Sequence, residues 1–277
     1  MKTSHLLLLL FLAATAMGQS TSDNTYKLVE DEDGIFVEIF DSTNVDENRY
    51  NHNNSVYKVG NRFTYRFEHI TPTNEVKYFN VAKDFKNWEF VDAANVDSNT
   101  VESIVIVVAN GNPMAAYIPD YSQTALVYKN GTGKGYSMSG AVENEANLWM
   151  HPPRHNYFKI LELNPFPYLK TPYEVGNKWT WNLKVGAHWA DSRWKLWEGQ
   201  IENNCTYEIT DKRTVKTELG EVECLVIEST AISRIGETSL IAYFNSKYGF
   251  VKLNYTNIDG SKTNFELIDF TDKKAKK

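Results

Sequence analysis

The chain has 277 residues, of which 42% are hydrophobic, 13% aromatic and 23% charged, an ordinary composition for a globular protein. Its 29 lysines and arginines against 35 aspartates and glutamates give a formal net charge of -6. This balance argues against nucleic acid as a partner, because binding to a phosphate backbone needs clustered positive charge. With 2 cysteines, 15 glycines and 8 prolines, the chain is neither a disulfide-stapled mini-protein nor collagen-like.

Residues 1–18 are predicted to be a signal peptide. Lys2 precedes an apolar run from Leu6 to Ala14, which is too short to span a membrane as a helix. Ala16 and Gly18 then supply the small residues of a cleavage site before Gln19. The alternative is a buried N-terminal helix. No later run approaches the length of a membrane span, so we expect an exported protein, periplasmic or extracellular, that is not an integral membrane protein.

The two cysteines are candidates for one disulfide. Export would place Cys205 and Cys224 in an oxidising compartment with no third cysteine to compete. The turn around Leu219 and Gly220 does not place them directly opposite each other in a simple hairpin, which leaves the unbridged alternative open. Two thiols are too few for a cysteine-rich zinc site.

Three sequence blocks recur in the same order, which predicts an internal duplication. YKVGNRFTYRF at 57–67 matches YEVGNKWTWNL at 173–183, and VESIVI at 101–106 matches VECLVI at 222–227. A third set, beginning at Leu126, matches one that begins at Leu253. The resulting segments are an acidic, Asn-rich N-terminal stretch, a first β repeat, a Pro-rich connector, a second β repeat and a basic tail, at 19–56, 57–140, 141–172, 173–270 and 271–277.

Each repeat has the pattern of antiparallel strands. Short runs with β-branched, aromatic or alternating residues are separated by turn dipeptides such as Asn110-Gly111 and Asp259-Gly260. We predict strands at 34–40, 62–69, 76–83, 101–109, 124–129, 178–185, 206–211, 222–229, 238–245, 250–255 and 262–268. The predicted fold is therefore mainly β and antiparallel: two duplicated curved-sheet or half-barrel units joined by the connector. The connector is apolar enough to require burial, between or across the sheets, with a short helix near 156–161.

The second repeat resembles a family of uncharacterised exported bacterial proteins. TELGEVECLVIE at 217–228, YFNSKYGFVKLNY at 243–255 and NFEL at 264–267 carry the resemblance, which covers roughly residues 173–270. The domain of unknown function in that family is an open, strongly curved β half-barrel, similar to lipoprotein carriers whose concave face holds apolar ligands. The resemblance implies the same architecture here and carries over no catalytic residue.

Aromatic residues mark the first candidate binding surface. Trp179 and Trp181 share one face of a predicted strand, where they line either the core or a cavity. Trp189, Trp194 and Trp197 lie in a segment that the second repeat has gained. These three form either a lid that stacks on sugar rings or covers a cavity, or a plug for the open end of the sheet.

The connector supplies the second candidate surface, with Trp149 followed by HPPRH at 151–155. His151, Arg154 and His155 are candidates for holding a carboxylate or phosphate. Alternatively, Arg154 is a structural clip that stacks on Trp149 or Tyr157. Two histidines without a third ligand at a recognisable spacing do not indicate a zinc site.

These patterns favour a non-enzymatic exported protein that holds an apolar or amphipathic, lipid-like ligand on a concave β face. One alternative is a glycan-binding or glycan-processing module that uses the Trp-rich segment, and another is a structural or assembly component of the cell envelope. We predict no metal, cofactor or catalytic residue from local motifs. A dyad of distant carboxylates stays open, because such pairs leave no local pattern.

Overall fold

The computed structural model describes residues 25–31, 33–40, 46–82, 88–118, 121–133 and 135–273. The predicted signal peptide and the last residues of the predicted tail, 274–277, lie outside these ranges. The strands are β1 (Tyr26–Glu30), β2 (Phe36–Phe40), β3 (Arg62–Ile70), β4 (Val76–Val81), β5 (Trp88–Val91), β6 (Ser103–Val108), β7 (Thr124–Asn130), β8 (Tyr136–Glu143), β9 (Asn147–Met150), β10 (Tyr168–Lys170), β11 (Lys178–Gly186), β12 (Gln200–Thr217), β13 (Gly220–Ser233), β14 (Gly236–Asn245), β15 (Gly249–Thr256) and β16 (Lys262–Thr271). The 3-10 helices are η1 (Arg49–Asn51), η2 (Ala93–Asn95), η3 (Pro113–Ala116), η4 (Asn156–Leu163) and η5 (Ala187–Trp189). None of the helices in these ranges is long and apolar enough to cross a membrane.

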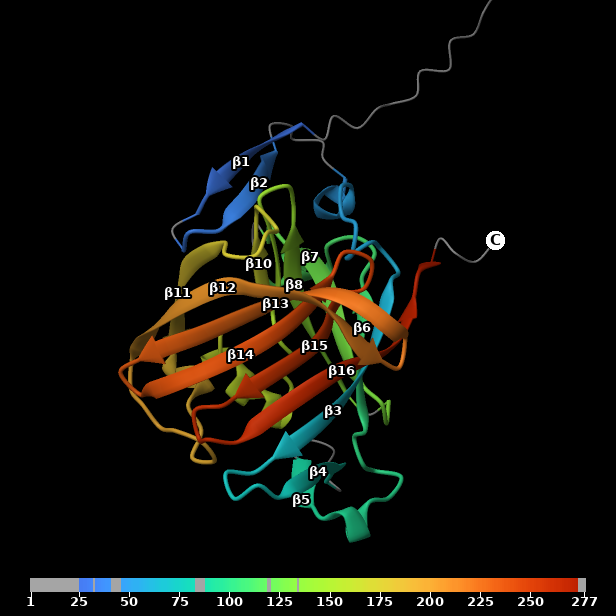
Figure 1. The fold of residues 1–277 in the computed structure, drawn as a ribbon, viewed down its shortest axis with the longest axis vertical. Helices are drawn as coiled ribbons and strands as arrows, with labels where there is room; N and C mark the ends of the chain where they lie inside the picture. Colours follow the sequence, from blue (N-terminus) through green and yellow to red (C-terminus); the bar gives the residue numbers. More distant parts are fainter. Residues whose placement is uncertain are drawn as a thin grey trace, which may run out of the picture.

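One antiparallel sheet curls into an almost closed barrel (Figure 1). Its strand order is β10-β9-β8-β7-β6-β3-β16-β15-β14-β13-β12-β11, and the prediction of a mainly β, antiparallel fold is confirmed. The two predicted half-barrel units are not separate sheets, because β3 pairs with β16 from Arg62 opposite Thr271 to Ile70 opposite Lys262. The first predicted repeat supplies β3, β6, β7 and most of β8, the predicted connector supplies β9 and β10, and the second repeat supplies β11 to β16, so the three segments form one sheet. The origin of the two repeats by duplication stays a prediction.

Alternation of side chains explains the curled sheet. Along β12, Ile201, Cys205 and Ile209 point inward and are buried, while Glu202 and Thr206 point outward and are exposed. A register shift between Ile209 and Asp211 interrupts the pairing of β12 with β13. Such β-bulges bend a strand, which allows this 18-residue strand to follow the curved sheet.

The barrel closes at the seam between β10 and β11 without a backbone ladder, since these end strands do not pair with each other. Side chains close the gap instead. The ring of Tyr168 on β10 lies 5.6 Å from that of Trp179 and 5.4 Å from that of Trp181, edge to face. Tyr207 on β12 lies a further 5.4 Å from Tyr168. Aromatic packing therefore takes the place of a ladder of backbone hydrogen bonds between β10 and β11.

The predicted short helix is confirmed as η4, which packs against the inner face of the sheet. Phe158, Ile160 and Leu161 are at most 1% exposed. The Phe158 ring lies 5.0 Å from that of Phe67 on β3. The last carbonyl of η4, on Leu163, accepts hydrogen bonds from Asn203 and Thr238, both at 2.8 Å. The segment predicted as a connector thus fills the barrel interior with its own apolar side chains.

The β1–β2 hairpin forms a separate two-stranded sheet beside one end of the barrel (Figure 1). The backbone N–H of Phe36 donates to Asn147 Oδ1 at 3.0 Å, and Asn147 Nδ2 donates to the Phe36 carbonyl at 3.1 Å. Asn144 Nδ2 donates to the same carbonyl at 2.9 Å. Two amide side chains from the β8–β9 turn therefore tie the hairpin to the barrel.

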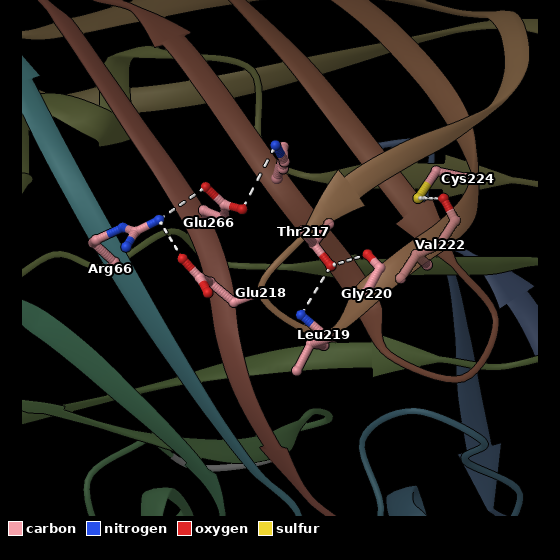
Figure 2. A network of polar contacts seen from close by, with 9 residues as sticks. Arg66, Thr217, Glu218, Leu219, Gly220, Val222, Cys224 and Glu266 are labelled. Carbon is pink, nitrogen blue, oxygen red and sulfur yellow. Dashed lines mark hydrogen bonds and ion pairs between the residues drawn. The ribbon is translucent and has the colours of Figure 1, made fainter.

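The tip of the β12–β13 hairpin leans over the outer face of the sheet (Figure 2). Glu218 at this tip lies 3.3 Å from the guanidinium of Arg66 on β3, which also lies 3.3 Å from Glu266 on β16. The turn itself is held by Thr217, whose hydroxyl donates to the Gly220 carbonyl at 2.9 Å (Figure 2). All three charged side chains are solvent-accessible, so these ion pairs orient the tip more than they stabilise the fold.

The predicted disulfide is wrong: Cys205 and Cys224 are both free and buried. Cys205 lies opposite Ala231, whereas Cys224 lies opposite Arg213. Along β13, Ala231 and Cys224 are seven positions apart, about 20 Å at the rise of a strand. A bridge needs Cα atoms within about 7 Å, so the long, in-register hairpin rules it out.

Candidate functional site

The three tryptophans nearest the seam pack on other aromatic rings of the chain. Trp149, Trp179 and Trp181 are 4%, 8% and 5% exposed. Trp149 lies 5.4 Å from Trp181, and Trp179 is stacked on Tyr207 at 5.3 Å with the ring planes 4° apart. The faces and edges of these rings contact other rings of the chain. The structure therefore brings the three tryptophans together as packing at the seam.

The predicted Trp-rich lid also lies against the barrel. Trp194 and Trp197 are 7% and 8% exposed, and Trp189 is partly buried. Trp194 donates its indole N–H to the carbonyl of Trp189 at 3.3 Å and lies edge-on to Tyr157 of η4 at 5.6 Å. The segment therefore covers η4, and its indoles are not arranged as an exposed platform for sugar rings.

The HPPRH motif places its arginine against a carboxylate of the chain itself. Arg154 Nε lies 2.9 Å from Glu162 Oε1, and the same guanidinium contacts His151 Nδ1. Arg154 also lies over the ring of Trp189, at 5.2 Å from its centroid, instead of over Trp149 or Tyr157. The third candidate, His155, is not part of this cluster; its ring lies edge-on to Trp88 at 5.7 Å.

Burial sets the charge states in this cluster. It raises the pKa of Glu162 to about 7 against the opposing effect of Arg154. It also lowers the pKa of His151 well below its usual value, and the positive charge of Arg154 acts in the same direction. His151 is therefore neutral and accepts a hydrogen bond from Arg154. The arginine already has the carboxyl group of Glu162 as its partner, so the motif holds the connector in place.

Little space is left inside the barrel. The cavity lined by Tyr128, Pro153 and Phe158 has a volume of about 10 Å³. A second, lined by Tyr65, Met150 and Leu253, has no room for even a water-sized sphere. The concave face is thus filled by η4 and the residues around it.

A larger pocket lies at one mouth of the barrel, between the β1–β2 hairpin and the ends of the barrel strands. We call it the mouth pocket; its volume is about 470 Å³, within the range of about 300–1,000 Å³ typical of small-molecule sites. It is lined by Tyr26, Asn53, Ser55, Val56, Glu143, Asn144, Glu145, Leu148, Thr171, Tyr173, Phe244 and Ser246. Val56, Leu148 and Phe244 are buried core residues, so the floor of the pocket is apolar.

A short hydrogen-bonded relay forms the polar side of the mouth pocket. Asn53 Nδ2 donates to the hydroxyl oxygen of Tyr26 at 3.1 Å, and that hydroxyl donates to Glu145 Oε2 at 2.9 Å. Burial and the acceptor Glu145 raise the pKa of Tyr26 to about 12, so the phenol keeps its proton. The relay fixes the exposed carboxylate of Glu145 at the edge of the pocket.

A second carboxyl group lies next to this relay. Glu38 on β2 is 6% exposed, and burial raises its pKa to about 7, with a further contribution from the negative charge of Glu145. Two carboxyl groups therefore lie beside one tyrosine, with Glu145 exposed and Glu38 buried.

Glu143 has a structural role although it lines the same pocket. Its carboxylate accepts backbone N–H groups from Ser55 at 2.5 Å, Val56 at 3.0 Å and Tyr57 at 2.9 Å. Burial raises the pKa of Glu143, and these hydrogen bonds oppose that effect. The residue holds the loop before β3, which supplies Val56 to the pocket floor.

Two further depressions lie over the outer face of the sheet. One, of about 650 Å³, contains the Arg66, Lys252 and Glu266 ion pairs. The other, of about 820 Å³, is lined mainly by hydroxyl and charged residues of β11 to β14. Within the described ranges, no group of three histidines, cysteines, aspartates or glutamates could hold a metal ion.

The mouth pocket combines an apolar floor with a few oriented polar groups, which makes it the candidate functional site.

Sequence reasoning did not identify Tyr26, Glu38, Asn53 or Glu145 as site residues. Tyr26 and Glu145 are separated by 119 positions, so no local spacing connects them. The sequence predicted one strand in this region, at 34–40, and left its partner β1 unrecognised.

No protein-family model matches the chain, and no curated protein matches it. Among solved structures, it is similar to a Bacteroides fragilis protein described as exported with a YmcC-like fold (12% identity, 78% of this chain and 97% of that one covered, TM-score 0.43). A protein described as a lipoprotein from Parabacteroides distasonis has 9% identity over 79% of this chain and 100% of that one, with a TM-score of 0.42. The lipoprotein YmcC from Escherichia coli has 8% identity over 75% of this chain and 84% of that one, with a TM-score of 0.35. None of the three descriptions names a ligand or an activity.

Proposed function

We propose that this is an exported, non-enzymatic binding protein that holds a small apolar or amphipathic molecule in the mouth pocket. The observation that carries the proposal is a pocket of about 470 Å³ with an apolar floor, beside a barrel interior that is already filled. The proposal keeps the ligand class expected from the sequence and moves the site from the concave face to the mouth.

The pocket walls favour a ligand with a compact apolar body. Val56, Leu148 and Phe244 supply the floor, and Tyr173 adds a partly exposed ring at the rim. Burial of apolar ligand surface stabilises a complex by roughly 25 cal/mol per Å² before the costs of association. On the polar side of the pocket, the hydrogen-bonded Tyr26 and Glu145 would orient the polar group of the ligand.

The alternatives have less support. A glycan site built on Trp189, Trp194 or Trp197 needs exposed coplanar rings, and two of these three rings are buried. A role in assembly of the cell envelope would need a partner surface, and no described feature singles one out.

The proposal is tested by native mass spectrometry of the full protein purified without denaturant, which would reveal a retained ligand. NMR titration with a panel of apolar and amphipathic small molecules then locates binding from shifts of the Tyr26, Asn53 and Ser246 amides. Ser246→Trp places a large ring in the pocket from an exposed position and should abolish binding. Thr206→Trp, an exposed site on the outer face of β12, is the matched control and should leave binding unchanged.

The proposal fails if no molecule in the panel shifts the pocket amides and native mass spectrometry shows the bare chain. It also fails if Ser246→Trp binds as tightly as the wild type, since binding would then lie elsewhere.

A further inference from the structure

We propose that the mouth pocket selects organic cations: amphipathic molecules that place a protonated amine beside Glu145 and an apolar group on the pocket floor. This inference rests on the proposed function and specifies its ligand class.

The charged side chains that line the pocket have one sign. Its lining contains two carboxylates, Glu143 and Glu145, and no lysine, arginine or histidine. Glu143 is committed to three backbone N–H groups, which leaves Glu145 as the lining carboxylate that faces solvent. The Tyr26 hydroxyl donates to Oε2 of Glu145. Within the described part of the chain, the other oxygen, Oε1, has no hydrogen-bond partner. A ligand ammonium group would supply the missing donor.

The hydrogen-bond directions also favour a donor on the ligand. The hydroxyl of Tyr26 donates to Glu145 and accepts from Asn53, so its one proton is already used. The polar group closest to Glu145 therefore has no proton left for a ligand acceptor. An anionic ligand would meet the exposed carboxylate of Glu145, with no cation in the lining to balance it.

Aromatic rings add to this preference. Tyr26, Tyr173 and Phe244 all line the pocket, and the faces of such rings attract cations by roughly 0.5–2 kcal/mol. Three lysines adjoin lining residues in the sequence, namely Lys27, Lys170 and Lys247. Lys170 Nζ lies 5.2 Å from the centre of the Phe36 ring, and Lys247 Nζ donates to the Tyr248 hydroxyl at 2.8 Å and lies 4.5 Å from the centre of that ring. None of the three lysines is part of the pocket lining.

The test uses three probes of similar shape and different charge: phenylbutylammonium, phenylbutanol and phenylpentanoate. Dissociation constants come from NMR titration of the full protein at pH 7.5 and low ionic strength. We expect the ammonium to bind at least about tenfold more tightly than the alcohol, and the carboxylate to bind more weakly than both. Salt at about 0.5 M should reduce the preference for the ammonium, because it screens an exposed charge pair.

Glu145→Gln isolates the charge, since the exposed side chain keeps its size and its ability to accept from Tyr26. This variant should lower ammonium affinity about tenfold and leave alcohol affinity unchanged. Glu198→Gln, an exposed glutamate outside the pocket lining, removes the same net charge and should change neither.

Equal binding of ammonium and alcohol would overturn the cation preference and leave the proposed binding function intact. Tightest binding of the carboxylate, or equal effects of Glu145→Gln and Glu198→Gln, would also overturn it. If none of the three probes shifts the pocket amides, both this inference and the proposed function fail.

Discussion

The side-chain amide of Asn147 makes with Phe36 the pair of hydrogen bonds that a neighbouring strand would otherwise make, accepting from its N–H and donating to its carbonyl. Asn147 is fully buried, and Asn144 Oδ1 in turn accepts a hydrogen bond from its backbone N–H at 3.0 Å. Phe36 is the first residue of β2, whose last residue, Phe40, pairs with Tyr26 on β1, so the anchor also helps to position one wall of the mouth pocket.

Asn147→Leu should detach the β1–β2 hairpin. The substitution leaves the Phe36 N–H and carbonyl without their partner, at a cost of about 1–3 kcal/mol for each unsatisfied group. Hydrogen exchange measured by mass spectrometry should rise over 26–40 and stay unchanged in β12 to β16. Asn182→Leu, at an exposed position of β11, is the control. Unchanged exchange in the hairpin would contradict this role of Asn147.

Glu38 should make the protein less stable as the pH rises through neutrality. Its pKa is raised from 4.5 to about 7 in the folded state, with Tyr26 and Glu145 as its charged or titratable neighbours. The folded protein therefore retains a proton between these two pH values that the unfolded chain releases. The stabilisation is fully present below about pH 4.5 and is lost as the pH rises through 7.

The measurement compares urea unfolding of the wild type and Glu38→Gln between pH 5 and pH 8. The variant should gain about 1–2 kcal/mol relative to the wild type over this range, because glutamine does not titrate. Glu162 and the buried histidines titrate in both proteins, so the difference between the two curves reports Glu38. Parallel curves would show that Glu38 keeps an ordinary pKa.

Phe158→Ala tests whether the connector is an integral part of the barrel core. Phe158 is 1% exposed and contacts Phe67, Trp88 and Phe265. Truncation should lower the free energy of unfolding by about 3–5 kcal/mol, since it removes a buried ring and leaves a cavity. Leu196→Ala, at a position 69% exposed, should change it by less than about 0.5 kcal/mol. A small effect at Phe158 would mean that η4 is only loosely held.

Both cysteines should resist modification in the native protein. Burial raises the pKa of Cys205 to about 12 and that of Cys224 to about 11, which suppresses the reactive thiolate. Iodoacetamide at pH 8 should label neither thiol in buffer and both in guanidinium chloride, as read by intact mass. A denatured, unreduced sample that takes up no label and weighs two hydrogens less would instead indicate a disulfide.

The sequence predicts the β strands well because alternation is a local property. Outward polar residues such as Thr180 and Asn182 alternate with inward Trp179 and Trp181, and this pattern defines β11 by itself. β9 and β10 were not predicted, because Asn147–Met150 and Tyr168–Lys170 are too short to show a period. β5 and β8 were also not predicted. The short helix at 156–161 was predicted from its apolar residues, but its place inside the barrel depends on closure of the whole sheet.

The candidate site was less predictable than the fold. The predicted site residues are mostly aromatic or basic, and the structure uses Trp149, Trp181 and Arg154 for internal contacts. Composition does not distinguish an aromatic ring that binds a ligand from one that packs in a core. The mouth pocket instead depends on Tyr26 meeting Glu145, a contact between distant segments that only the tertiary structure creates.

The pairing of β3 with β16 has a consequence for how the chain is made. β3 begins at Arg62 and its partner strand ends at Thr271, so one edge of β3 stays unpaired until nearly the whole chain has been synthesised. Contacts between residues so far apart in the sequence form slowly. Until β16 pairs with it, the unpaired edge of β3 is prone to aggregation. The sheet is thus completed only after β16 has been synthesised, which makes β16 the strand that ends the exposure of this edge.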